Sequence, residues 1–253
     1  MRFFLIISFS ALCTSLFAQV HCNTNRYDTV DIFQNTQLKT DTLVYGYNYD
    51  WNGVLDTLGL FVLYPSAAAD TATKRPMILM LHGGGFTTGS AKSMKNQAQY
   101  FARKGYVAVT IDYRLGLSKD CVPGNLSQGY ASYRALQDAH AAGRFMVAHA
   151  AEYKVDTAAI FAYGRSAGAV TSLMLQYVTD EVANIVFPAE IPASLGGLHN
   201  ATNNYTNIFS IKGICSVSGG FTDTSVITTS NLVPTQMFHG TADQLTSFAA
   251  SES

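Results

Sequence analysis

Residues 160–168 read IFAYGRSAG, an apolar run that leads directly into a serine between small residues. Residues 160–163 have the composition of a buried strand, and helical spacing begins near Ala167. A G-x-S-x-G pentapeptide at a strand-to-helix turn presents a nucleophilic serine, and glycines suit the crowded positions beside it. The pentapeptide alone also occurs by chance in turns. Its place between strand and helix nevertheless predicts Ser166 as a nucleophile.

A glycine-rich segment, HGGGF at residues 82–86, directly follows the apolar residues 77–81. Three successive glycines let the backbone turn its N–H groups toward a bound carbonyl, where a developing negative charge is stabilised. We therefore predict an oxyanion hole formed by the amides of Gly84, Gly85 and Ala167. A phosphate-binding loop is the alternative, but the segment lacks the Lys-Ser/Thr pair of a P-loop and the spacing of a dinucleotide fingerprint.

Strand patterns alternate with helix patterns along the chain, which favours a mostly parallel central sheet with helices on both faces. The sequence therefore predicts the α/β class. Strands are expected at residues 42–50, 58–64, 76–81, 106–113, 159–163, 211–217 and 236–239, and helices at residues 93–104, 130–153 and 167–178. The first two strands are expected to be antiparallel. Residues 115–132 and 188–206 show no clear periodicity, and we expect binding loops there.

The order of three motifs resembles that of carboxylesterases of the hormone-sensitive-lipase and type B groups. These motifs are HGGGF, then VTIDYRL at residues 109–115, then GRSAG at residues 164–168. Residues 138–146 and 148–156 resemble the same families, and exported acetylxylan and feruloyl esterases share the layout. The resemblance covers residues 43–243 and implies the α/β-hydrolase fold. It also implies that two oxyanion donors come from the glycine-rich loop and the third from the residue after the nucleophile.

The resemblance implies a serine carboxylic-ester hydrolase that forms an acyl-enzyme, and with export it suggests carbohydrate-linked esters. The short segment 188–206 is expected to form only a small cap over the site, which favours short-chain acyl groups. Tyr113, Arg114 and Asp138 match framework positions of these families and are expected to be structural. No metal or organic cofactor is implied. Two alternatives stay open: a catalytically silent binding protein on this fold, and a serine peptidase of the same fold. Oligomeric state is left open.

HGTAD at residues 239–243 resembles the H-G-x-x-D turn after the penultimate strand of many α/β-hydrolases. In those enzymes the aspartate orients the catalytic histidine. The resemblance therefore implies that Asp243 is the acid of a Ser-His-Asp triad, with a simple turn aspartate as the alternative. Asp223 is the second candidate. His239 is expected to be a turn residue of this motif.

The triad histidine should follow the acid in this fold, yet none of the six histidines lies beyond Asp243. We expect the sequence to be a C-terminally incomplete piece of a longer protein, without the last strand and helix of its domain. In one alternative His199 serves as a rearranged base, and in the other the fold persists without catalysis. His82 is expected to shape its loop and not to act as the base.

Residues 1–18 combine a positive start with an apolar run shorter than the ~20 residues that a membrane span needs. They predict a signal peptide, with an α/β-hydrolase domain at residues 19–253 and a secreted or periplasmic location. A net charge of -1 gives no reason to expect nucleic acid as a partner. The expected partner is a small-molecule or carbohydrate ester. Cys22 and Cys121 are candidates for a disulfide, and Cys215 is expected to be a buried apolar residue.

Overall fold

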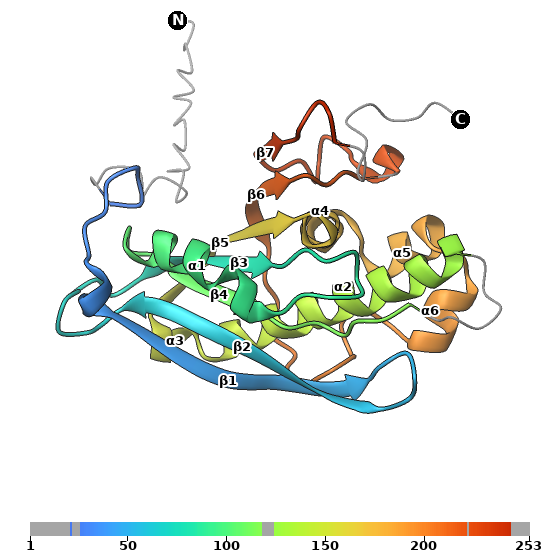
Figure 1. Cartoon of the computed structure of the whole chain (residues 1–253), viewed down its shortest axis with the longest axis horizontal. Coiled ribbons are helices and arrows are strands. Elements are labelled where there is room, and N and C mark those ends of the chain that lie inside the picture. Colours follow the sequence, from blue (N-terminus) through green and yellow to red (C-terminus); the bar gives the residue numbers. More distant parts are fainter. Residues whose placement is uncertain (1–20, 22–25, 118–123, 222, 244–253) are drawn as a thin grey trace, which may run out of the picture.

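The computed structural model describes residues 21, 26–117, 124–221 and 223–243. The expected signal peptide and the candidate cysteine pair Cys22 and Cys121 lie outside the described residues. The elements seen in Figure 1 assemble into one layered α/β structure around a central sheet. None of the described helices is both long and apolar enough to cross a membrane.

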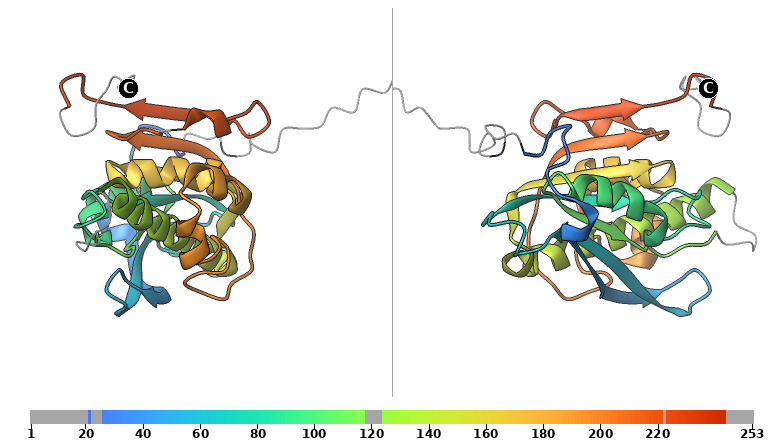
Figure 2. Two further views of the ribbon diagram at one scale, coloured as in Figure 1. Left: turned by 90° about the vertical axis from the view of Figure 1, so that its right-hand side faces the viewer. Right: turned by 60° about the vertical axis from the view of Figure 1, so that its left-hand side comes forward.

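The sheet has seven strands in the order β1-β2-β4-β3-β5-β6-β7, so β1 and β7 lie at opposite edges (Figures 1 and 2). The strands are β1 (Leu38–Tyr49), β2 (Leu55–Pro65), β3 (Arg75–Leu81), β4 (Val107–Ile111), β5 (Val155–Arg165), β6 (Ile211–Val217) and β7 (Thr235–Phe238). β1 pairs antiparallel with β2, and β2 pairs antiparallel with β4. The pairs from β4 to β7 are all parallel. The mixed, mostly parallel sheet expected from the sequence is confirmed.

Helices cover both faces of this sheet. They are α1 (Lys95–Ala102), α2 (Gly124–Ala148), α3 (Ala150–Tyr153), α4 (Ala167–Tyr177), α5 (Asp180–Val186) and α6 (Glu190–Leu195), with 3-10 turns η2 (Asn35–Gln37), η3 (Ala91–Met94) and η4 (Thr224–Val226). α1 packs on β2 and β4, and α4 packs on β5 and β6 from the opposite side. α2 packs against α4 and β1.

Strand β3 shows why the apolar run at residues 77–81 is a central strand. Met77, Leu79 and Leu81 pack in the larger core, which includes residues of α2 and α4. Ile78 and Met80 pack in a second core together with Ala98 of α1 and others. Successive side chains of a strand point to opposite faces, so a strand with two covered faces needs apolar residues at every position.

The structure corrects three local expectations. α2 begins at Gly124, six residues before the expected start. Residues 188–206, expected to be irregular, contain the short helix α6, and α5 precedes them. Both helices have only six or seven residues, too few for a clear helical period. Cys215 is free and half-buried, not fully buried, because it lies on β6 near the open β7 edge.

A buried acidic residue ties the segment before β3 to the N-terminal arm. Asp70, 3% exposed, accepts hydrogen bonds from both terminal nitrogens of Arg26 at 2.8 and 2.7 Å and from Arg75 Nε at 2.9 Å. Burial alone raises the pKa of Asp70. Hydrogen bonds from Arg26 and Ala72 and the charges of both arginines outweigh burial and hold the pKa well below its usual value.

We expect this cluster to make the protein sensitive to acid. A depressed folded-state pKa contributes stability above the unfolded pKa of about 3.9, and this stability is lost as pH falls through the folded value. The melting-temperature difference between the wild type and Asp70→Asn should therefore be full at pH 6 and shrink below about pH 4. Differential scanning calorimetry from pH 6 to pH 2 measures it. A difference independent of pH would contradict the assignment.

Candidate active site

Ser166 occupies the turn between β5 and α4, where its backbone adopts φ 52° and ψ -121°. Its N–H donates to Val217 O at 2.8 Å, and its carbonyl accepts from the amides of Ala169 and Val170 at 2.8 and 3.1 Å. A positive φ at a non-glycine residue costs about 1–3 kcal/mol and persists only where the surroundings hold it. β6 and the first turn of α4 hold this residue in place.

The two glycines of the pentapeptide are required by close backbone contacts. A Cβ on Gly164 would lie 2.0 Å from Gly168 O, and one on Gly168 would lie 2.2 Å from Leu81 O. No larger residue fits without moving α4 away from the ends of β3 and β5. These contacts confirm that both positions beside the serine are crowded, as predicted from the sequence.

The glycine-rich loop lies directly against Ser166. A Cβ placed on Gly83 would lie 3.1 Å from Ser166 Cβ. Gly84 and Gly85 have φ values of 129° and 61°, and the Gly84 carbonyl accepts from the amides of Thr87 and Thr88, which closes the turn. Within the described part of the chain, the amides of Gly84, Gly85 and Ala167 donate no hydrogen bond.

His82 supports this loop from below. Its ring stacks on Tyr113 with centroids 4.1 Å apart, and its Nδ1 lies 2.8 Å from Gly83 O. The Tyr113 hydroxyl donates to His82 O at 2.7 Å. Burial lowers the pKa of His82, so the ring is neutral and donates from Nδ1 to the carbonyl. This position agrees with the expected loop-shaping role.

The H-G-x-x-D turn and Ser166 both follow the carboxyl ends of parallel strands, β7 and β5, on the same side of the sheet. Phe238 pairs with Val217, and Val217 pairs with Arg165, so His239 starts two strands away, about 10 Å. His239 Nε2 lies 3.5 Å from Asp243 Oδ2, and the Asp243 amide donates to Gly240 O. His239 and Asp243 therefore face each other across the turn.

Asp223, the second candidate for the triad acid, forms hydrogen bonds within its own turn. The Asp223 carboxylate caps η4 by accepting from the amide and the hydroxyl of Ser225, at 2.9 and 2.5 Å. These hydrogen bonds lower the pKa of Asp223. Capping explains this carboxylate without a catalytic role.

Comparison with known proteins identifies the family from the middle of the chain. Residues 63–229, which include the glycine-rich loop and Ser166, match the family model BD-FAE. The chain belongs to the BD-FAE family. This is an esterase family with the α/β-hydrolase fold. The turn that carries Asp243 lies outside the matched residues.

Solved structures and curated relatives agree with this family. Native esterase 2 of Thermogutta terrifontis is 25% identical with a TM-score of 0.56, over 83% of this chain and 73% of that one. Its propionate-bound form is 24% identical with a TM-score of 0.57, over 83% and 74% of the two chains. Juvenile hormone esterase of Heliothis virescens is 28% identical over 42% of this chain, and the neuroligin-like protein glit-1 of Caenorhabditis elegans is 34% identical over 46%. The aligned parts are only 18% and 15% of those two relatives.

A cavity of about 440 Å³ in this BD-FAE chain begins one helical turn from Ser166, at Val170, and Ser166 itself does not line it. It runs from the glycine-rich loop to the second turn of α4 and the segment after β6. Its lining is mainly apolar and comprises Phe86, Leu126, Gln128, Gly129, Ser132, Val170, Met174, Val186, Phe187, Pro188, Gly220 and Phe221. Leu126, Gln128, Gly129 and Ser132 fall within residues 115–132, where a binding loop was expected, although they lie on α2. Sequence reasoning missed the contribution of α5, because no motif marks it.

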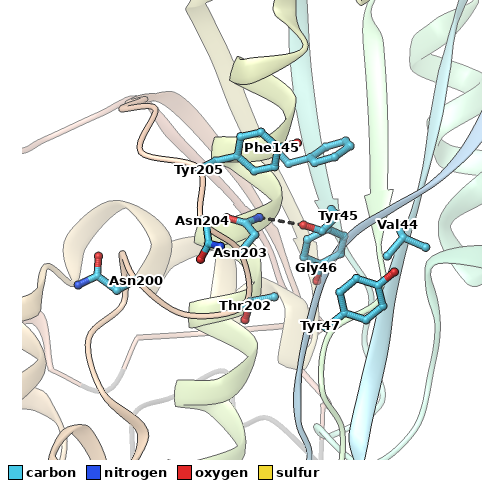
Figure 3. Close-up of a pocket in the computed structure, with 10 residues that line it drawn as sticks. All are labelled: Val44, Tyr45, Gly46, Tyr47, Phe145, Asn200, Thr202, Asn203, Asn204 and Tyr205. Atoms are coloured by element: carbon cyan, nitrogen blue, oxygen red, sulfur yellow. Dashed lines mark hydrogen bonds between the residues drawn. The ribbon is translucent and has the colours of Figure 1, made fainter.

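The segment expected to cap the site lies mostly elsewhere. Of residues 188–206, only Pro188 lines the cavity beside Ser166. Residues 200 and 202–205 instead line a cavity of about 650 Å³ against β1, four strands from β5 in the sheet order (Figure 3). Asn203 fixes this segment by donating to Tyr45 O and Ala141 O, both at 2.9 Å.

His199 does not reach Ser166, which contradicts the alternative in which it serves as a rearranged base. Its ring contacts His140 with centroids 4.8 Å apart, in a cavity bounded by residues 175–179 at the far end of α4. Leu175 follows Ser166 by nine residues (175 − 166), or about 14 Å along a helix axis.

The framework residues form a buried ion pair. Arg114 Nε lies 3.0 Å from Asp138 Oδ2, and the exposed fractions of the two side chains are 2% and 0%. Arg114 also donates to Gln137 Oε1 at 2.8 Å, and Asp138 accepts from Thr202 Oγ1 at 2.6 Å. The pair joins the end of β4 to α2 and the 200–205 segment. Its position is structural, as the resemblance implied.

Proposed function

We propose that the protein hydrolyses carboxylic esters through an acyl-enzyme at Ser166. The observation that carries this proposal is the strained turn at Ser166, which lies against a glycine-rich loop. The N–H groups of Gly84, Gly85 and Ala167 donate no hydrogen bond within the described part of the chain. Such preorganised donors act where negative charge develops in acyl transfer. Membership of an esterase family supports the same chemistry.

In the proposed reaction, Ser166 Oγ attacks the ester carbonyl as a base removes its proton. The carbonyl oxygen becomes negatively charged and accepts hydrogen bonds from Gly84, Gly85 and Ala167. Collapse of this intermediate breaks the bond to the alcohol, which leaves with the proton, and the acyl group stays on Ser166. Water then attacks the acyl-enzyme, and the acid is released.

Asp243 is the proposed acid of the triad, and the base is proposed to be a histidine that is not among the six of the printed sequence. The positions of the described histidines support a base other than these residues. His82 is buried beneath the loop, while His140 and His199 lie at the far end of α4. His239 starts two strands from Ser166 and turns its Nε2 to Asp243. A serine hydroxyl without a base remains protonated and is a weak nucleophile at neutral pH.

Short-chain esters, or acyl groups carried on carbohydrate, are the proposed substrates. The cavity beside Ser166 is apolar and, at about 440 Å³, lies near the small end of ligand pockets. A structure of the Thermogutta terrifontis esterase is described as propionate-bound, which is a short acyl acid. We also propose a secreted or periplasmic location.

Labelling with a fluorophosphonate tests the nucleophile and the base together. We expect intact-mass analysis to show one adduct on Ser166 in protein expressed with the coding sequence that follows residue 253. The 253-residue chain alone should label at least about a thousand-fold more slowly, because loss of a triad member costs several orders of magnitude. A Ser166→Ala variant that is labelled equally would refute Ser166 as the nucleophile. Fast labelling of the 253-residue chain would place the base inside it.

A further inference from the structure

A second cavity, of about 590 Å³, lies at the end of α4 remote from Ser166. It is enclosed by α2, by residues 175–179 and by the segment that leads into β6. Its lining comprises His140, Arg144, Leu175, Gln176, Val178, Thr179, His199, Asn200, Thr206, Asn207, Ile208, Phe209, Ser210 and Ile211. None of these residues lines the cavity beside Ser166.

One wall of this cavity carries buried polar groups without partners. His140 and Arg144 are 6% and 3% exposed and stand four residues apart on α2, so they share a face of the helix. His140 Nε2 and Arg144 Nε are fully shielded and have no hydrogen-bond partner within the described part of the chain. A shielded polar atom without a partner costs free energy unless a ligand or water satisfies it.

The charge of Arg144 is also uncompensated by direct contact. Its terminal nitrogens donate to Leu198 O, Ala201 O and Asn203 Oδ1, all neutral groups. No carboxylate among the described residues forms an ion pair with it. Asp180 acts on it electrostatically, but Asp180 Oδ1 already accepts the Leu198 amide at 2.6 Å. A buried guanidinium without an ion-pair partner is stabilised when an anion binds next to it.

The rest of the lining combines seven polar residues with five apolar ones. Leu175, Val178, Ile208, Phe209 and Ile211 supply aliphatic and aromatic surface opposite the basic wall. His199 is exposed beside His140 and adds a second imidazole ring at the opening. A ligand that satisfies both sides combines one anionic end with an apolar body.

We propose that this cavity binds a small organic monocarboxylate, with its carboxylate at His140 and Arg144 and its apolar part against Val178 and Phe209. Burial lowers the pKa of His140 to about 3, with His199 and Arg144 adding to the effect, so His140 donates as a neutral ring. Arg144 supplies the positive charge. Both nitrogens are shielded in this structure, so a carboxylate that accepts from them must rotate the two side chains toward it, and it then removes both unpaired donors.

Other ligand classes fit less well. A metal ion is disfavoured because Arg144 repels it, and the described residues contain no cluster of three or more His, Cys, Asp or Glu able to hold one. A dianion such as phosphate needs more charged donors than one guanidinium. The carboxylate of Glu181 interacts with His199 near the opening, which further disfavours a dianion.

Titration of the Ser166→Ala protein with benzoate tests the site, and this background removes any turnover. The readout is the histidine Cε1–H NMR resonances, assigned with single-histidine variants. We expect benzoate to shift the resonances of His140 and His199 saturably. Benzamide, its neutral counterpart of the same shape, should bind at least about ten-fold more weakly, because it lacks the charge that pairs with Arg144.

Two variants test the contact, and one serves as a matched control. His140→Phe and Arg144→Lys should each weaken benzoate binding about ten-fold or more. His149→Phe changes a histidine on the turn after α2 that stacks on Phe145 outside the cavity, and it should leave binding unchanged. Near-ultraviolet circular dichroism checks that each variant folds. Equal binding of benzoate and benzamide, or no shift of the His140 resonance, would overturn the proposal. These two results come from the Ser166→Ala protein alone, so they do not depend on how the His140 and Arg144 variants fold.

Discussion

Replacement of Ser166 by alanine should abolish ester turnover while the fold survives. The side chain supplies the attacking oxygen in the proposed reaction, and removal of the nucleophile of such a triad lowers kcat by about 10⁶ where this has been measured. Hydrolysis of p-nitrophenyl acetate by protein expressed with its downstream coding sequence measures the effect. We expect the variant to fall to the rate without nucleophilic catalysis.

Stability separates this loss from misfolding. Alanine at this position keeps the strained φ of 52° but removes only one half-buried hydroxyl. The melting temperature should therefore change little. Ser172→Ala is a matched control on the same helix, since the Ser172 hydroxyl donates within α4 to Ala169 O and lies outside the cavity beside Ser166. Ester turnover that persists in Ser166→Ala would reject Ser166 as the nucleophile, and lost turnover in Ser172→Ala would show that α4 itself is fragile.

The parts of this site that follow from local sequence were predictable. In the run from Ile160 to Gly168, Gly164 and Gly168 allow the close approach of β3, β5 and α4. The three glycines after β3 place a loop at the carboxyl edge of the adjacent strand, and parallel pairing brings that loop to Ser166. Local pattern and sheet topology together decide these contacts.

The parts that depend on packing at a distance were not predictable. The segment after α6 was expected beside Ser166, yet it lies against β1 and α2. Gly46 shows why: a Cβ there would lie 2.5 Å from Thr202 O, so β1 and this segment touch backbone to backbone. No pattern in the residues around Thr202 predicts a contact with Gly46, which lies more than 150 positions earlier in the chain. The contribution of Val186 on α5 to the cavity beside Ser166 was missed for the same reason.

Loss of the Asp138 carboxylate should be the most damaging single change to stability. Asp138→Asn leaves Arg114 with its charge buried and turns an amide nitrogen toward groups that donate: Arg114 and the Thr202 hydroxyl. Breaking a buried ion pair by removing one partner costs about 3–5 kcal/mol, a large fraction of the total stability of a domain. Chemical denaturation at neutral pH should show this loss of unfolding free energy.

A second variant shows whether the loss comes from the stranded charge or from the shape of the site. Arg114→Met combined with Asp138→Leu removes both charges, and replacement of a whole buried pair by apolar residues is often neutral or stabilising. We expect the double variant to be more stable than Asp138→Asn alone. Arg103→Gln is the control, because Asp31 is well exposed to water and keeps its pair with Lys104, so the loss of stability should be small. If the double variant is as unstable as Asp138→Asn, then the hydrogen bonds from Arg114 to Tyr49 O and Gln137, and from Thr202 to Asp138, hold this junction more strongly than the charge pair does.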